Sequence, residues 1–353
     1  MEKKQKLKIA VLMGGNSSER DVSLVTGNAI VDGLKKAGHD VIAIDTALGA
    51  SQLPPPDKDR VPLIKEQPPE LNELSRLTGE TTVQTVSSPD LRLVDLVFIA
   101  LHGGAGENGT VQALLDLLEI PYTGSGVLAS AVSMDKLAAK RIVSAAGINT
   151  PDYFVRLSSE AFEERELIEA VKKSIGFPVV IKPNDQGSSI GLNVVNSPEA
   201  LFSSVKEAAR YSDKVLFERF IDGRELTVSI LGDRALPVAE IKPKSGFYDY
   251  AHKYIPGLTD KTLPALLTVE ETEKIQKLAM RVVDALDIKG YARIDFRMSP
   301  DGTIYFLEAN TLPGMTPTSM VPKAAKAVGI DFPELLDRIS RIALEDFERR
   351  RKI

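Results

Sequence analysis

The chain has 353 residues, 43% of them hydrophobic and 26% charged, which is an ordinary balance for a water-soluble protein and a length that predicts two or three domains. The net charge of −5 excludes the basic footprint of a nucleic-acid-binding protein. Because the sequence has no cysteine, disulfides, thiolate metal sites and thiol nucleophiles are excluded, and we expect a reducing, cytoplasmic location.

The first third of the chain alternates between strand and helix patterns. Apolar runs predict strands at residues 8–13, 40–45 and 94–101. A helix is predicted from about Ser18 to Ala37. This alternation predicts a parallel α/β domain. No apolar run is long enough for a signal-peptide core or a membrane span, so we expect neither export nor a membrane partner.

The next segment, Thr46 to Arg92, contains several prolines and little periodicity, which predicts a peripheral, irregular connection with one short helix. A helix is predicted from Thr110 to Glu119. A second one would begin after Ser133 as its N-cap and end before Gly147. We place a domain boundary near residue 130.

The remainder, from Pro151 onward, has the character of an α+β protein. Strands are predicted at residues 177–183, 214–221, 225–231 and 236–243. Helices are predicted after Ser197, from Glu270 to Leu286, and after Asp331. A long loop from Lys244 to Leu263, rich in Tyr and Lys, is either a surface connection or a lid that excludes water from a reactive intermediate.

Residues 293–310 predict a β-hairpin with an unusual charged face. Arg293 and Asp295 lie two residues apart, as do Glu308 and Asn310, so each pair projects to one side of its strand. Two carboxylates and an amide are hard oxygen donors of the kind that bind magnesium, and Arg293 would neutralise charge on a phosphate. The alternative is an ordinary solvated strand face.

Two further loops have polar residues at sites where ligands bind. Lys182 precedes a loop containing Gly187, Ser188, Ser189 and Gly191, whose backbone could approach an anion, although such a loop is more often only a connection. It does not match the Walker pattern, so any nucleotide would be bound by another fold.

The glycine-rich segment after the first strand contains Ser18, Glu19, Arg20 and Asp21 in a capping-box pattern. That role would account for Ser18 and Asp21 but not for Glu19, which is predicted to lie at the ligand-binding edge of the parallel sheet. His102, after the strand ending at Leu101, is either a ligand contact or a structural histidine.

Taken together, the segments GGNSSERDVSL, ALHGGAGENG, YTGSGVLASAVSMDK, VIKPNDQGSSIG, SGFYDYAHKY, RIDF and LEANTLPGMT resemble the D-alanine–D-alanine ligases of the ATP-grasp superfamily over nearly the whole chain. The resemblance implies an N-terminal parallel α/β domain (1–130), a central subdomain (131–215) and a C-terminal subdomain (216–353). ATP would be held between the two antiparallel sheets of the last two. We expect a homodimer, as is common in the family.

The resemblance also implies roles for individual residues. Contacts to ATP are expected from Lys136, Lys182, Ser189, Glu218, Glu225, Tyr248 and Lys253. Two Mg²⁺ or Mn²⁺ ions are expected on Asp295, Glu308 and Asn310. The catalytic group would comprise Glu19, Ser188, Tyr254, Arg293 and Gly314. The two D-alanines would contact Glu19, His102, Lys253, Arg293, Ser319 and Met320.

The implied reaction joins two D-alanines through an acyl phosphate, for peptidoglycan precursors. Alternatives are a ligase of the same fold that makes D-alanine–D-lactate or D-alanine–D-serine, and a non-catalytic nucleotide-binding module. Tyr254 favours the dipeptide, and the presence of the expected metal ligands and of Arg293 argues against the module. The long segment from Thr46 to Arg92 and the pair Asp260-Lys261 depart from the family pattern.

Overall fold

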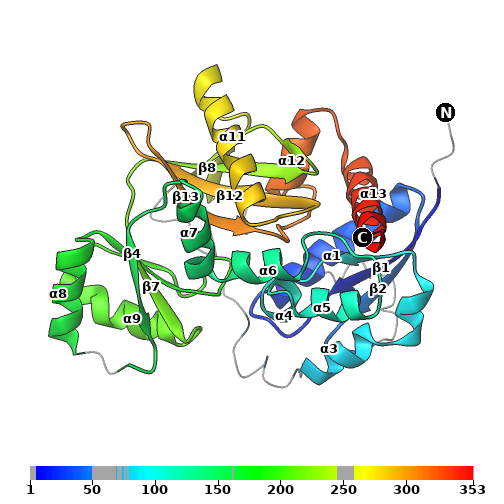
Figure 1. Ribbon diagram of the computed structural model, residues 1–353, viewed down its shortest axis with the longest axis horizontal. Coiled ribbons are helices and arrows are strands. Elements are labelled where there is room, and N and C mark those ends of the chain that lie inside the picture. Colours follow the sequence, from blue (N-terminus) through cyan, green and yellow to red (C-terminus); the bar gives the residue numbers. More distant parts are fainter. Residues whose placement is uncertain are drawn as a thin grey trace.

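A computed structural model describes residues 5–49, 69, 74, 77, 79–160, 163–244 and 258–352. Within these residues the chain forms a parallel sheet and two antiparallel sheets, each covered by helices (Figure 1). This arrangement confirms the expected fold class. None of the described helices combines the length and the apolar character needed to cross a membrane.

The N-terminal sheet contains three parallel strands in the order β2-β1-β3: β1 (Lys8–Met13), β2 (Asp40–Asp45) and β3 (Leu96–Ile99). The helical segments of this domain are α1 (Arg20–Lys36), α3 (Gly79–Val86), η1 (Pro89–Leu93), α4 (Gly104–Glu107), α5 (Thr110–Leu117) and α6 (Val127–Met134). The strands are parallel because each helical crossover carries the chain back to the end of the sheet where the previous strand began. Its carboxyl edge therefore gathers the loops that follow β1 and β3.

The central sheet is antiparallel, with the order β4-β7-β5-β6: β4 (Tyr153–Leu157), β5 (Val179–Pro183), β6 (Asn193–Val195) and β7 (Lys214–Arg219). Two helices and a short 3₁₀ turn accompany it: α8 (Glu164–Ser174), η2 (Pro198–Ala200) and α9 (Leu201–Ala209). Apolar side chains of α8 and α9 share one core with the strands. Val180, Lys182 and Glu218 alternate with core positions on β5 and β7 and line a cavity.

The C-terminal sheet has the order β11-β10-β8-β12-β13, with β9 paired to β8. Its strands are β8 (Arg224–Leu231), β9 (Arg234–Ala235), β10 (Ala239–Pro243), β11 (Thr259–Thr262), β12 (Tyr291–Met298) and β13 (Ile304–Asn310). Helices α7 (Lys136–Ala145) and α11 (Val269–Ala285) pack into its core. The chain ends with α12 (Met320–Ala327) and α13 (Phe332–Arg351).

Helix α13 returns to the beginning of the chain. Leu335, Leu336 and Ile339 belong to the same core as β1 and β3, and Figure 1 shows the helix beside α1 and the N-terminal sheet. A buried hydrogen bond joins His39 Nε2 to Asp337 Oδ1 at 3.2 Å. The last helix therefore fixes the N-terminal domain against the rest of the chain.

Two predicted helix caps are wrong. The N-cap of α1 is Glu19, and the Ser18 hydroxyl instead donates to Gln186 Oε1 at 3.2 Å. Ser133 lies within α6, and α7 is capped by Asp135, whose side chain accepts a hydrogen bond from the Ala138 N–H. In both places a tertiary contact or an additional helix overrides a local pattern.

Other differences concern the extent of elements. Strand β11 occupies residues 259–262 within the predicted loop, because it pairs with β10. The expected boundary between 215 and 216 falls inside β7, so we propose that the central subdomain ends after Arg219. The described part of 46–92 contains α3 and η1. The N-terminal boundary near residue 130 likewise stays a proposal.

Candidate active site

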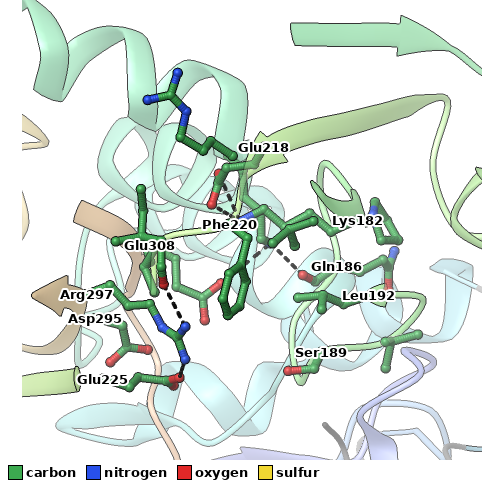
Figure 2. A pocket seen from close by; sticks show the side chains of 17 residues that line it. Lys182, Gln186, Ser189, Leu192, Glu218, Phe220, Glu225, Asp295, Arg297 and Glu308 are labelled. Carbon is green, nitrogen blue, oxygen red and sulfur yellow. Dashed lines mark hydrogen bonds and ion pairs between the residues drawn. The ribbon is translucent and has the colours of Figure 1, made fainter. Parts of the chain in front are cut away.

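An open cavity lies between the central and C-terminal sheets, with an empty volume of about 790 Å³ that includes space open to solvent. The predicted nucleotide and metal residues that line it are Lys136, Lys182, Ser189, Glu218, Glu225, Asp295 and Glu308. Figure 2 shows Lys182 and Glu218 on one side and Asp295 and Glu308 on the other. The fold thus brings together side chains from two sheets that sequence spacing alone could not place.

Lys136 lies in the first turn of α7, and its side chain lines the cavity. Its Nζ donates to the carbonyl oxygen of Gln186 at 2.5 Å and lies 3.8 Å from Glu308 Oε2. The ammonium therefore links the Gly/Ser loop of the central sheet to the hairpin of the C-terminal sheet. A triphosphate entering between them would meet a cation already held in place.

A buried charge cluster forms one wall. Glu218 Oε2 forms ion pairs with Lys140 Nζ at 2.6 Å and with Lys182 Nζ at 3.2 Å. Lys182 Nζ also donates a hydrogen bond to Glu218 Oε1 at 3.3 Å, and Glu218 is only 2% exposed. Burial opposes ionisation of Glu218, but Lys140 and then Lys182 outweigh it, so the pKa of the carboxyl is lowered. Glu218 is an anion in this cavity.

Lys140 was not predicted. It lies one turn after Lys136 in α7 and is fully buried, with Nζ 2.6 Å from Thr150 Oγ1. Burial lowers the pKa of this lysine to about 8, with Glu218 opposing the shift. Lys140 follows the core residue Ala139 and precedes the core residue Val143 by three positions. This place on the helix could have indicated from the sequence that Lys140 is buried.

The charged hairpin face is folded inward rather than solvated. Asp295 and Glu308 are direct cross-strand partners, and a bulge follows Asp295. Arg293 donates to both oxygens of Asp295, with Nη2 2.7 Å from Oδ2, and lies 4.0 Å from Glu308 Oε1. Thr227 Oγ1 also donates to Asp295 Oδ1 at 2.6 Å. The alternative of an ordinary surface strand is therefore wrong.

The donor chemistry of this face fits a hard cation. Asp295 and Glu308 offer carboxylate oxygens at the cavity wall, which is the ligand type that magnesium prefers. Asn310, the third predicted ligand, does not line the cavity in the described part of the chain, and its Oδ1 accepts from the Leu312 N–H at 3.0 Å. In the described residues no group of three or more His, Cys, Asp and Glu side chains could hold a metal.

A second group of polar residues lies where the N-terminal sheet meets the central loop. Glu19, at the start of α1 and 5% exposed, accepts a hydrogen bond from the Ser188 hydroxyl. A Cβ added at Gly187 would lie 2.5 Å from Glu19 Oε2, so a larger residue there would require the Glu19 carboxylate to shift. Ser188 and Ser189 both have positive φ, of 49° and 58°. The predicted pairing of Glu19 with Ser188 is confirmed as a contact.

His102 and Glu107 adjoin that group and are both buried. Burial, with a further contribution from Arg293, lowers the pKa of His102 to about 4, so the ring is neutral. Burial and the nearby charge of Glu19 raise the pKa of Glu107 to about 8. Glu107 Oε2 accepts from the Gly103 N–H at 2.8 Å. Glu107 was missed, although an acid within a glycine-rich edge loop is a recognisable signal.

The remaining predicted residues flank α12. Ser319 is its N-cap residue, and Met320, which begins the helix, is buried. Ser319 Oγ accepts from the Thr316 N–H at 3.1 Å, and a Cβ at Gly314 would lie 3.3 Å from that oxygen. Gly314 and the start of α12 are thus adjacent. The predicted residues Tyr248, Lys253 and Tyr254 lie outside the described residues.

Comparisons with known proteins agree on one family. Residues 8–125 match the family model for the D-ala D-ala ligase N-terminus, and residues 142–341 match that for the D-ala D-ala ligase C-terminus. A D-alanine–D-alanine ligase from Pelotomaculum thermopropionicum is 40% identical, covering 98% of this chain and 99% of the relative. One from Halalkalibacterium halodurans is 42% identical, covering 96% and 100%.

Solved structures are similar over the same length. The D-alanine–D-alanine ligase from Bacillus anthracis complexed with ATP has a TM-score of 0.73 and 32% identity, covering 98% of this chain and 99% of that one. The VanG D-Ala:D-Ser ligase from Enterococcus faecalis has a TM-score of 0.77 and 31% identity, covering 96% and 100%. The similarity spans all three sheets of the fold.

Proposed function

The chain belongs to the D-alanine–D-alanine ligase family, and we propose that it joins two D-alanines at the cavity between its two antiparallel sheets. The reaction is an ATP-dependent ligation that serves peptidoglycan synthesis. The observation that best supports this site is the convergence of Lys136, Lys182, Asp295 and Glu308 on one cavity. Cations and carboxylates together are what a metal-bound triphosphate requires.

The nucleotide is proposed to lie along the cavity. Its phosphates would contact Lys136 and Lys182, its adenine Glu218, and its ribose Glu225, with Ser189 as a further donor. Glu225 lines the cavity, and its Oε2 lies 3.4 Å from Arg297 Nη2, an ion pair that orients the carboxylate. We also assign Tyr248 and Lys253 to the nucleotide on family resemblance alone.

Divalent cations are proposed to bind at Asp295, Glu308 and Asn310. When bound, Mg²⁺ or Mn²⁺ would neutralise charge on the transferring phosphoryl group. The role of this chain's own residues is to orient the carboxylates. Thr227 holds one Asp295 oxygen and Arg293 holds both, so these two residues would orient the carboxylate toward a cation.

The first D-alanine is proposed to bind at the edge of the N-terminal sheet. Glu19, fixed by Ser188, would pair with its ammonium group, beside neutral His102, with Tyr254 completing this network and Lys253 contacting the substrate. A carboxylate is a poor electrophile, so phosphorylation by ATP to an acyl phosphate must precede amide formation.

The second D-alanine is proposed to present its carboxylate to Ser319 and Met320 at the start of α12, where unpaired N–H groups favour anions. Attack by its amine on the acyl phosphate gives a tetrahedral oxyanion, which Arg293 and the Gly314 N–H would stabilise. Exclusion of water would protect the intermediate from hydrolysis. We further propose a homodimer in the cytoplasm.

The test is phosphate release from ATP with D-alanine, L-alanine, D-serine or D-lactate alone, and with D-alanine together with D-serine or D-lactate, with the ligation product identified by mass. We expect release and dipeptide formation only with D-alanine. The similarity to the VanG D-Ala:D-Ser ligase makes a mixed D-alanine–D-serine product the second candidate. Absence of any product would overturn the assignment, and a mixed product would reassign the second substrate.

A further inference from the structure

We propose that Lys140, which lines no part of the cavity, is a positioning residue that serves as the permanent counter-ion of Glu218 and so leaves Lys182 available for the phosphates of ATP. The inference rests on the proposed function, because it assumes that Lys182 binds the nucleotide. Lys140 is not among the residues that the sequence predicted to contact ATP.

The two lysines differ in how they are held. Lys182 Nζ lies 3.2 Å from Glu218 Oε2 and 3.3 Å from Oε1, and Lys182 lines the cavity. Lys140 Nζ lies closer, 2.6 Å from Oε2, and its side chain is completely buried. Only Lys182 is therefore in a position to turn toward a ligand.

Further contacts fix the Lys140 ammonium. It donates to Thr150 Oγ1 at 2.6 Å, and that hydroxyl donates to the carbonyl oxygen of Phe306 in β13 at 3.2 Å. The ring of Tyr153 lies 5.6 Å from the same Nζ, a favourable cation–π distance. Lys140 thus joins β7 of the central sheet to β13 of the C-terminal sheet.

The charge balance explains why two lysines are present. A buried carboxylate without a cation would take up a proton, and a carboxylate with only one lysine would hold that lysine. With Lys140 in place, Lys182 can leave Glu218 without exposing an unpaired anion. The lowered pKa of Glu218 is consistent with two cations acting on it.

The experiment measures binding of adenosine and of a non-hydrolysable ATP analogue by calorimetry to wild type and Lys140→Met. We expect the analogue to bind about tenfold more weakly, since a charge-assisted contact is lost, and adenosine to bind almost unchanged. In kinetics, KM for ATP should rise more than kcat falls. Lys140→Arg should restore part of the affinity.

A double-mutant cycle identifies the route of the effect. If Lys140 acts through Lys182, Lys140→Met should weaken analogue binding far less in a Lys182→Met background than in wild type. Arg141→Met, at an exposed position of the same helix, is the matched control and should leave the affinities for the analogue and for adenosine unchanged. Thr150→Val should also weaken binding of the analogue. It provides a second test if Lys140→Met does not fold.

If Lys140→Met weakened binding of the analogue and of adenosine equally, its role would be merely structural and the inference would be overturned. The same conclusion would follow if the effects of Lys140→Met and Lys182→Met on analogue binding were additive. Unchanged binding by Lys140→Met would overturn it as well. Failure of the proposed function would look different, because the wild-type protein would then bind no analogue and release no phosphate with D-alanine.

Discussion

Two buried glutamates in this protein ionise in opposite ways. Glu107, at the edge of the N-terminal sheet, is 6% exposed, and Glu218, in the cavity between the antiparallel sheets, is 2% exposed. Burial alone would keep both protonated. Yet the pKa of Glu107 is raised to about 8, whereas that of Glu218 is lowered.

The neighbours account for the difference. Glu107 adjoins the charge of Glu19, which adds to the effect of burial, and its backbone partners compensate only in part. Glu218 faces Lys140 and Lys182. The edge of the N-terminal sheet therefore favours the protonated form of Glu107, while the cavity between the antiparallel sheets favours the ionised form of Glu218 beside two lysines. Each arrangement suits the charge of the ligand proposed for it.

The largest effect should come from removing anionic charge in the cavity. Asp295→Asn or Glu308→Gln is expected to lower kcat by about 10²-fold or more, because each removes a hard ligand for the divalent cation. Thermal unfolding and adenosine binding should change little. Near-normal turnover of either variant at millimolar magnesium would contradict the assignment of the metal site.

The contrast between the two buried glutamates is tested by replacing each of them with glutamine. Glu218→Gln should lower the free energy of unfolding by about 3–5 kcal/mol at pH 7, because it leaves buried Lys140 and Lys182 without an anion. Glu107→Gln, the matched control, should lower it by less than about 1 kcal/mol, since the native carboxyl is already mostly protonated. Urea unfolding measures both, and equal losses would refute the contrast.

A smaller effect is expected from Ser188→Ala. The substitution removes a donor to buried Glu19, which should lower the free energy of unfolding by about 1–3 kcal/mol. The KM for D-alanine should rise while ATP binding stays unchanged. Ser203→Ala, at an exposed helix position, serves as the control. An unaltered KM for D-alanine would separate Glu19 from the substrate.

The smallest effect is a pH dependence at Glu107. Between pH 4.5 and about 8 the folded wild-type protein holds a proton that the unfolded chain releases, so this group's contribution to stability declines as pH rises. The Glu107→Gln variant has no titrating carboxyl at this position, so its stability does not show that decline with pH. We expect the free energy of unfolding of the variant to gain about 1 kcal/mol relative to that of the wild type between pH 6.5 and 7.5. A pH-independent difference in unfolding free energy would show that Glu107 is ionised.

Much of the fold was predictable because its signals are local. Alternating apolar runs predicted the parallel strands β1, β2 and β3 and the hairpin β12-β13, and the structure confirms them. Helix α12 was not predicted, and β4 and α8 were also missed. Their segments are short or polar, and packing against neighbouring elements decides their conformation.

The candidate site divides in the same way. Strand periodicity placed Arg293 with Asp295 because side chains two residues apart share a face. Likewise, the Gly/Ser loop after Lys182 was visible as a place of close backbone approach. These inferences needed only the chain's own geometry, and the family resemblance added the residue roles, which stay predictions.

Only the tertiary structure brought distant residues together. Glu19 and Ser188 are 169 positions apart, and their contact depends on how the central loop meets the N-terminal sheet. The ionisation of Glu107 and Glu218, and the presence of Lys140 behind the cavity, depend on burial and on neighbours from other elements. A carboxylate's charge is a property of its surroundings, so the sequence determined which acids are present and the fold decided which of them are anions.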